Sequence, residues 1–136
     1  MVRPIMKNIL FLSQPSQSAA RKDLAVVDDL LDTLKANAAG CVGMAANMIG
    51  VQKRIIAVNT GIFYLVMFNP EITKQSGPYE AEEGCLSLMG VRKITRYQTI
   101  QVRYQDRDFR WHTQTFTGCT AQIIQHEVDH CNGVII

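Results

Sequence analysis

The apolar positions in the N-terminal part of the chain recur at the spacing of a helix. Between Ser18 and Asn37 they fall three or four residues apart, and the charged residues lie largely on the other side. This periodicity predicts an amphipathic helix with one buried stripe. The stripe consists of Leu24, Val27, Leu31 and Leu34. Residues 1–15 lack the pattern and predict a loop-like segment with a short apolar patch at Ile9–Leu12.

The middle of the chain has the composition of β-strands. Two segments, Arg54–Asn59 and Ile62–Asn69, are rich in β-branched and aromatic residues, and a turn-forming Asn-Thr-Gly sequence lies between them. Such segments are typical of strands joined by a turn. A further short strand is expected at Glu71–Gln75, because Pro70 precedes it and a Ser-Gly-Pro sequence at residues 76–78 follows it.

Alternation continues further along the chain. Ile100, Val102 and Tyr104 alternate with polar residues, as do Phe109 and Trp111. Residues 105–108, Gln-Asp-Arg-Asp, form a plausible turn between the two segments. The pattern therefore predicts an antiparallel hairpin.

A last helix is expected from Thr117-Gly118 to about Asn132, with Gly133 as its stop. A helix, several antiparallel strands and a terminal helix predict an α+β fold in one domain over residues 1–136. In this fold the antiparallel strands pack around the C-terminal helix, and the N-terminal amphipathic helix completes the core.

Composition narrows the class of protein. The chain has 136 residues, of which 47% are hydrophobic and 19% charged, with a net charge of +2. These values suit one globular domain, and the absence of a basic run argues against direct nucleic-acid binding. No apolar stretch approaches the ~20 residues of a membrane span, and residues 1–8 do not read as a signal peptide. The four cysteines lack C-x-x-C spacing, so a cytoplasmic location is expected.

Candidate chemistry lies in the last predicted helix. Residues 125–130 read Gln-His-Glu-Val-Asp-His. On a helix, His126 and His130 stand one turn apart, ~6 Å, so both imidazoles can reach one metal ion with Glu127 beside it. This H-E-x-x-H arrangement predicts metal-assisted hydrolysis with Glu127 as general base. The alternative is a chance grouping on an ordinary helix.

A catalytic zinc-type site usually takes three protein ligands, so a third one is needed from upstream. Cys119 lies two helical turns before His126, too far to share the metal, and Cys131 points away from His130 toward the core. His112, beside Trp111 in a predicted strand, is more typical of a surface or hydrogen-bonded histidine. The remaining candidates are Cys41 and Cys85.

Cys85 is favoured of these two. Gly84 before it permits close approach, and the backbone N–H of Leu86 after it would lie where it could stabilise an oxyanion. The alternative is a buried free cysteine. The glycine-rich residues 40–50 also allow close approach to a ligand, although a tight packed loop explains their composition nearly as well. Their spacing is neither that of a Rossmann motif nor that of a P-loop, so phosphate binding is not expected.

Three segments together resemble the peptide deformylase family, which carries the motifs G-x-G-x-A-A-x-Q, E-G-C-L-S and H-E-x-D-H in this order. Residues 83–87 match the second motif completely, and residues 125–130 match the third. The first is matched by Gly43-Met44-Ala45-Ala46, with Cys41 in place of the leading glycine and Met48 in place of the glutamine. The resemblance extends over nearly the whole chain, which looks like a compact member of the family.

The resemblance implies a reaction and a set of roles. Cys85, His126 and His130 would bind the metal, natively Fe²⁺, with Zn²⁺, Ni²⁺ or Co²⁺ as replacements. Glu127 would take a proton from the attacking water and deliver it to the leaving amine. The Leu86 N–H would help to hold the oxyanion. The products would be formate and a free N-terminus, a step in the processing of N-terminal methionine during protein biosynthesis.

The resemblance also implies how substrate is held. The backbone at Val42, Gly43 and Gly84 would bind an extended N-formylmethionyl nascent peptide, and the ribosome is a candidate partner. Ile123 and the stem of Arg92 would line an apolar pocket for the methionine side chain. An ion pair of Arg96 and Asp129 would lie behind the metal helix and orient the ligands.

Met48 is the functional difficulty, because a thioether cannot donate the hydrogen bond that the family's glutamine provides to the oxyanion. Asn47 carries an amide next to it, but adjacent side chains usually diverge. Three hypotheses follow, in this order. The chain is a slow deformylase, acting on N-formylmethionyl or other N-acylated peptides; or a silent relative that binds metal and a peptide or ribosomal partner; or a domain with a structural metal site.

Overall fold

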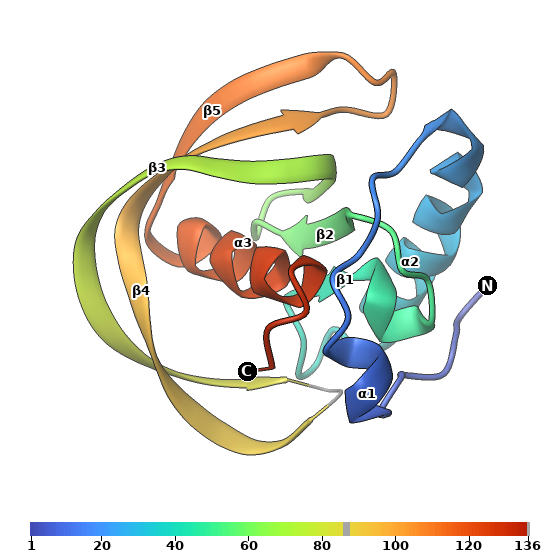
Figure 1. The fold of residues 1–136 in the computed structure, drawn as a ribbon, viewed down its shortest axis with the longest axis horizontal. Coiled ribbons are helices and arrows are strands. Elements are labelled where there is room, and N and C mark those ends of the chain that lie inside the picture. Colours follow the sequence, from blue (N-terminus) through green and yellow to red (C-terminus); the bar gives the residue numbers. More distant parts are fainter. Residues whose placement is uncertain (86–87, 136) are drawn as a thin grey trace.

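The computed structural model describes residues 1–85 and 88–135, and these residues form one antiparallel five-stranded sheet with a helix enclosed in its curve (Figure 1). The strands follow one another in chain order across the sheet. They are β1 Gly43–Ala45, β2 Ile55–Asn59, β3 Tyr64–Cys85, β4 Leu88–Gln105 and β5 Trp111–Thr117. The α-helices are α1 Ile9–Leu12, α2 Leu24–Ala36 and α3 Gly118–Cys131, and 3₁₀ turns form at η1 Arg21–Asp23 and η2 Ala46–Ile49. The predicted α+β class is confirmed.

Helix α3 agrees with the predicted terminal helix to within one residue at each end. Figure 1 shows β3 and β4 bending around it. Its apolar face packs into a core with the strands, because Ala121, Ile124, Val128 and Cys131 meet apolar residues of β2, β3 and β4. Cys131 is 1% exposed, so its predicted place in the core is confirmed. This packing gives the metal-site helix a fixed position inside the sheet.

Helix α2 is shorter than predicted. The chain is still extended at Ala20, whose N–H donates to the Asp23 side chain at 2.8 Å, and the α-helix begins only at Leu24. With this contact to Asp23, the first turn is the 3₁₀ helix η1 and not part of the α-helix. The spacing of the apolar residues could not reveal this difference. Val27, Leu31 and Leu34 are buried as predicted. Leu24 is 37% exposed, so its assignment to the core stripe was wrong.

Strand β3 joins two segments that were predicted as separate strands. Around Pro70 the pairing with β4 shifts between Phe68 and Glu71, and Asn69 adopts a φ of 52°. At residues 76–78 the ladder continues on both sides of Gly77, which has a φ of 72°. The predicted breaks are therefore wrong, because bulges and positive φ let a strand pass such residues while it curves.

The hairpin of β4 and β5 is confirmed. The Asp106 carboxylate accepts the N–H groups of Asp108 and Arg110 at 2.9 and 3.0 Å and closes the turn. Ile100, Val102 and Tyr104 are buried, which confirms their alternation. The alternation of Phe109 and Trp111 is wrong: Phe109 lies in the turn with a φ of 59°, and Trp111 is 48% exposed under the guanidinium of Arg103.

The N-terminal segment is more ordered than the predicted loop. Asn8 caps the short helix α1, and Leu12 is completely buried. The segment runs beside α3 and η2, where the Ser16 N–H donates to the Cys131 carbonyl and the Met6 N–H to the Met48 carbonyl. The glycine-rich residues 40–50 likewise fold into β1 and η2. In the described ranges, none of the helices has the length and apolarity needed to cross a membrane.

Candidate metal centre

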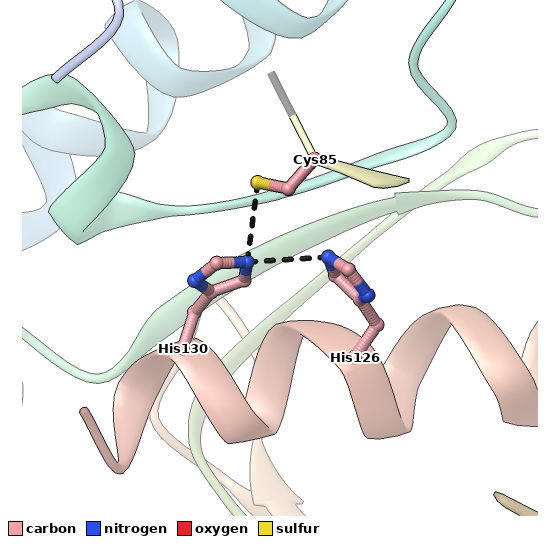
Figure 2. A group of neighbouring side chains, drawn as sticks. All are labelled: Cys85, His126 and His130. Atoms are coloured by element: carbon pink, nitrogen blue, oxygen red, sulfur yellow. Dashed lines mark hydrogen bonds between the residues drawn. The ribbon is translucent and has the colours of Figure 1, made fainter. Parts of the chain in front are cut away.

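Two elements supply a cluster of one thiol and two imidazoles. Cys85 stands at the end of β3, and His126 and His130 lie one turn apart on α3 (Figure 2). The Cys85 sulfur is 3.3 Å from Nε2 of His130, and the two Nε2 atoms are 3.2 Å apart. All three ligand atoms lie within 4.8 Å of one another. A set of one sulfur and two nitrogens fits a tetrahedral metal ion with one position left open.

His126 is oriented by a carboxylate. Its Nδ1–H donates to Oε1 of Glu83 at 2.7 Å, which leaves Nε2 free to face the cluster. Carboxylate–histidine pairs of this kind set the tautomer and ring orientation of metal ligands. Burial alone would raise the pKa of Glu83, but hydrogen bonds from His126, Arg96 and Gln122 lower it to about 2. Glu83 is therefore a carboxylate at neutral pH.

A buried ion network holds Glu83. Arg96 is 3% exposed and donates to Glu83 through Nε and Nη2. Its Nη1 donates to the Asp129 carboxylate at 2.6 Å. The predicted pair of Arg96 and Asp129 is thus confirmed as a contact. It belongs to a larger network, because Gln122 also donates to Glu83, at 2.9 Å, and accepts from the Tyr79 hydroxyl at 3.3 Å.

The two histidines differ in their affinity for protons. Burial alone would lower the pKa of His126, but contacts with Cys85 and Glu83 raise it to about 10. Burial and the neighbouring His126 lower the pKa of His130 to about 3. In the metal-free protein His126 therefore carries the proton of the pair. A metal ion requires neutral imidazoles, so its binding would displace that proton.

Glu127 lies beside the cluster and is 3% exposed. Burial raises its pKa to about 7. Its Oε1 is buried and has no hydrogen-bond partner among residues 1–85 and 88–135. A carboxyl group of this kind can exchange protons near neutral pH and has an oxygen available for a substrate or water. These are the properties of a general base.

A cavity of about 610 Å³ opens onto the cluster and Glu127. Other described residues that the sequence singled out line it too: Cys41, Val42, Gly43, Met48, Gly84, Cys119 and Ile123. Arg92 pairs with Glu83 in the β3–β4 ladder and is not among the described residues that line the cavity. Leu86, expected to supply an oxyanion N–H, lies outside the described residues. The substrate and oxyanion roles stay predictions.

Gly43 lies where the backbone of β1 meets α3. A Cβ at this position would be 2.6 Å from Cγ2 of Ile123 and 2.9 Å from Oε2 of Glu127. Both distances are shorter than normal contacts, so a larger residue would force these side chains to move. The close approach that the glycine-rich segment suggested is therefore directed at Ile123 and Glu127.

We expect Gly43→Ala to lower the free energy of unfolding by ~1–3 kcal/mol, the usual cost of overpacking, because Ile123 and Glu127 must move. Displacement of Glu127 should also lower any hydrolysis that uses it as a base. Urea unfolding and a hydrolysis assay measure the two effects. Gly40→Ala is the matched control, because no atom of the described residues lies within 4 Å of the added Cβ. Equal effects of the two variants would contradict this reading of Gly43.

Met48 is buried at the cavity wall, 1% exposed. Its sulfur accepts the Ala45 N–H at 3.5 Å, so this side chain offers no donor to a ligand. Cys41 also faces the cavity, and its thiol donates to the Gly43 carbonyl at 2.9 Å while burial raises its pKa to about 11. Cys41 is thus a protonated thiol outside the ligand cluster, which agrees with the preference for Cys85.

The structure also shows why Cys119 and His112 are not metal ligands. Cys119 is exposed at the start of α3 and is not part of the cluster that the described residues form. His112 stacks on Tyr104, and its Nε2 lies 2.6 Å from Asp106. It is a hydrogen-bonded surface histidine, as expected.

Sequence reasoning missed two residues of the site, Glu83 and Gln122. Glu83 was noted only as the first letter of a motif, although it orients His126. A carboxylate two residues before a proposed ligand on a strand shares its face, which is a signal that could have identified it. Gln122 stands one turn before His126 on α3, so its helical spacing could have indicated the contact.

Comparison with known proteins gives a consistent result. The family described as polypeptide deformylase matches residues 5–136. A peptide deformylase of Clostridium beijerinckii is 57% identical over 136 residues, which is all of both chains. One of Syntrophomonas wolfei is 39% identical over 113 residues, 82% of this chain and 73% of the relative.

Solved structures agree with these relatives. A class I type b peptide deformylase of Acinetobacter baumannii with bound Met-Ala-Ser superposes with a TM-score of 0.89 at 29% identity, covering 99% of this chain and 97% of that one. Peptide deformylase of Thermotoga maritima gives a TM-score of 0.91 at 26% identity, covering 99% and 95%.

Proposed function

Because the chain belongs to the polypeptide deformylase family, we propose that its cavity binds N-formylmethionyl peptides and that the cluster at its base removes the formyl group. The chain is a peptide deformylase and a metallohydrolase. The observation that carries the assignment of the site is the convergence of Cys85, His126 and His130 beside the buried base Glu127. A metal site with a purely structural role would not require a buried general base beside its ligands.

The metal ligands, the general base Glu127 and the orienting carboxylate Glu83 have different roles in the proposed reaction. The metal, held by Cys85, His126 and His130, would polarise the formyl oxygen and lower the pKa of a water at the open position. Glu127 takes a proton from the attacking water and delivers it to the leaving amine, because its pKa of about 7 suits both directions of transfer. Glu83 keeps the His126 ring in place during the reaction.

The substrate peptide would bind along the wall of the cavity. Gly43 begins β1, which is an edge strand because it pairs only with β2 among the described strands, and Val42 directly precedes it. An extended peptide can add to such an edge through backbone hydrogen bonds. The apolar Ile123 would contact the methionine side chain, and Gly84 would allow the peptide to approach closely. Arg92 would border this pocket through its aliphatic stem.

The finer assignments concern the metal and the partners. We propose Fe²⁺ as the native ion, as the family resemblance implies. Zn²⁺, Ni²⁺ and Co²⁺ are the proposed replacements, because a thiolate with two imidazoles suits all of them. We propose nascent N-formylmethionyl peptides as the substrates and the ribosome as a candidate partner. A cytoplasmic location is proposed on the same ground.

A formate assay tests the function. Anaerobically purified, Fe²⁺-loaded protein should release formate from formyl-Met-Ala-Ser and should leave acetyl-Met-Ala-Ser largely intact. Faster release of acetate than of formate would redirect the assignment to another N-acyl substrate. No release of either acid at full metal occupancy would favour a silent peptide-binding relative.

We expect Met48→Gln to raise formate release by up to about 10²-fold, because one oxyanion donor is typically worth 10²- to 10³-fold in turnover. The new amide would stand at the cavity wall, where the Met48 thioether offers only an acceptor. The measurement is kcat on formyl-Met-Ala-Ser at saturating metal. Met48→Leu is the control, since it changes the side chain without adding a donor. If the two variants behave alike, the missing donor does not limit the rate.

A further inference from the structure

The ring of His126 is oriented by a hydrogen bond from its Nδ1–H to Glu83, whereas no described residue pairs with the Nδ1 of His130. The Nε2 of His130 faces Cys85 and His126, and its Nδ1 lies on the side of the ring away from His126 (Figure 2). This Nδ1 is buried, and within residues 1–85 and 88–135 it has no hydrogen-bond partner. An imidazole that binds metal through Nε2 carries a hydrogen on Nδ1, and that hydrogen needs an acceptor.

Asn47 lies directly against His130. It belongs to η2, is 1% exposed, and donates from Nδ2 to the His130 backbone carbonyl at 2.9 Å. Its Oδ1 is also buried and lacks a partner in the described part of the chain. One acceptor and one potential donor, both buried and both unsatisfied, thus belong to two residues already in contact. A buried polar atom without a partner is destabilising, which favours their pairing.

We propose that Asn47 is a positioning residue for the metal centre: its Oδ1 accepts the Nδ1–H of His130 when the metal is bound. Asn47 would then orient the ring of His130 through its Nδ1–H, as Glu83 orients the ring of His126. The terminal torsion of an asparagine is broad, so the amide can rotate to present its Oδ1 to the Nδ1–H of His130. The inference rests on the proposed metal-dependent function and concerns the metal-loaded protein.

The contact has a chemical consequence for the site. It would fix the His130 tautomer with Nε2 toward the metal and would limit rotation of the ring. Partners of this kind typically change metal affinity by 10- to 100-fold when they are removed. Asn47 occupies the unspecified position of the first sequence motif, so the motif itself assigns it no role.

Nuclear magnetic resonance of the Zn²⁺-loaded wild-type protein tests the contact without any substitution. In a ¹⁵N-labelled sample, both His126 and His130 should show a protonated Nδ1 with slow hydrogen exchange. A His130 ring that is protonated on Nε2, or whose Nδ1–H exchanges as fast as that of the exposed His112, would overturn the proposal.

Variants of Asn47 separate its acceptor from its donor. Asn47→Leu removes both atoms, and we expect Zn²⁺ to dissociate into a chelator about 10- to 100-fold faster. Asn47→Asp keeps the acceptor and loses the donor, and it should retain Zn²⁺ within a few fold of wild type. If Asn47→Asp loses Zn²⁺ as fast as Asn47→Leu, the bond to the His130 carbonyl is what matters and the proposal fails.

Asn37→Leu is the matched control. Asn37 also donates from Nδ2 to a helix carbonyl, that of Thr33 at 2.8 Å, but on α2, away from the cluster. It should lower thermal stability without changing Zn²⁺ dissociation. A wild-type protein that takes up no Zn²⁺ would contradict the metal centre itself. Tight wild-type binding with an unchanged rate in Asn47→Leu would contradict the role of Asn47 alone.

Discussion

Glu127→Gln should lower formate release by about 10²- to 10⁴-fold, the usual contribution of a general acid–base group. The amide keeps the size of the carboxyl group but cannot take a proton from water or return one to the leaving amine. Glu127 has the environment of such a group, because it is 3% exposed and burial raises its pKa to about 7. The metal ligands are untouched, so Fe²⁺ content should stay at the wild-type level.

Steady-state formate release, metal analysis and binding of the product Met-Ala-Ser measure the three properties of this variant. Peptide affinity should be unchanged within a few fold, so that the loss appears in kcat. Glu82→Gln is the control, because it makes the same chemical change at an exposed position of β3. A variant that keeps its metal and still turns over at the wild-type rate would show that Glu127 is not the base.

Arg96→Met should lower the free energy of unfolding by ~3–5 kcal/mol, because it removes the cation from a buried ion network and leaves charge without compensation. Arg96 and Glu83 are 3% and 8% exposed, and Arg96 contacts both Glu83 and Asp129. Methionine fills much of the same volume, so the effect should reflect charge more than packing. Metal affinity should fall too, since Glu83 positions His126.

Urea unfolding of the metal-free and metal-loaded proteins separates these two effects. Lys93→Met is the control: it removes an ion pair with Glu80 between the same two strands, but both side chains are 70% exposed. Exposed pairs contribute ~0–1 kcal/mol, so this variant should unfold almost as wild type does. Similar losses in the two variants would mean that the buried network does not stabilise the fold.

The local features of the site were predictable from the sequence. The spacing of His126 and His130 is a property of one helix, and the helix itself follows from its apolar face and its terminal glycines. The Cys85 ligand could be favoured only by its glycine neighbour and by exclusion of the other candidates. Its convergence with the two histidines depends on how β3 ends beside α3.

The length of β3 could not be predicted, because Pro70 and residues 76–78 are strand breakers in most settings. Here a register shift accommodates Pro70, and the positive φ of Gly77 lets the strand continue through residues 76–78. The burial of Leu24 and Trp111 was predicted wrongly for a related reason. Periodicity shows which residues share a face of a helix or strand. Whether the residues at each end of that face are buried depends on the elements packed against them.

The α+β class, the C-terminal helix with its two histidines and base, and the position of Met48 in the first motif follow from the amino-acid sequence. The partners that orient this site depend on tertiary packing. Glu83 meets His126 across 43 residues of chain, and Asn47 meets His130 across 83. Helix periodicity relates residues three or four positions apart, whereas these contacts follow from the packing of η2 and β3 against α3. That packing is set by the whole core and not by any local pattern.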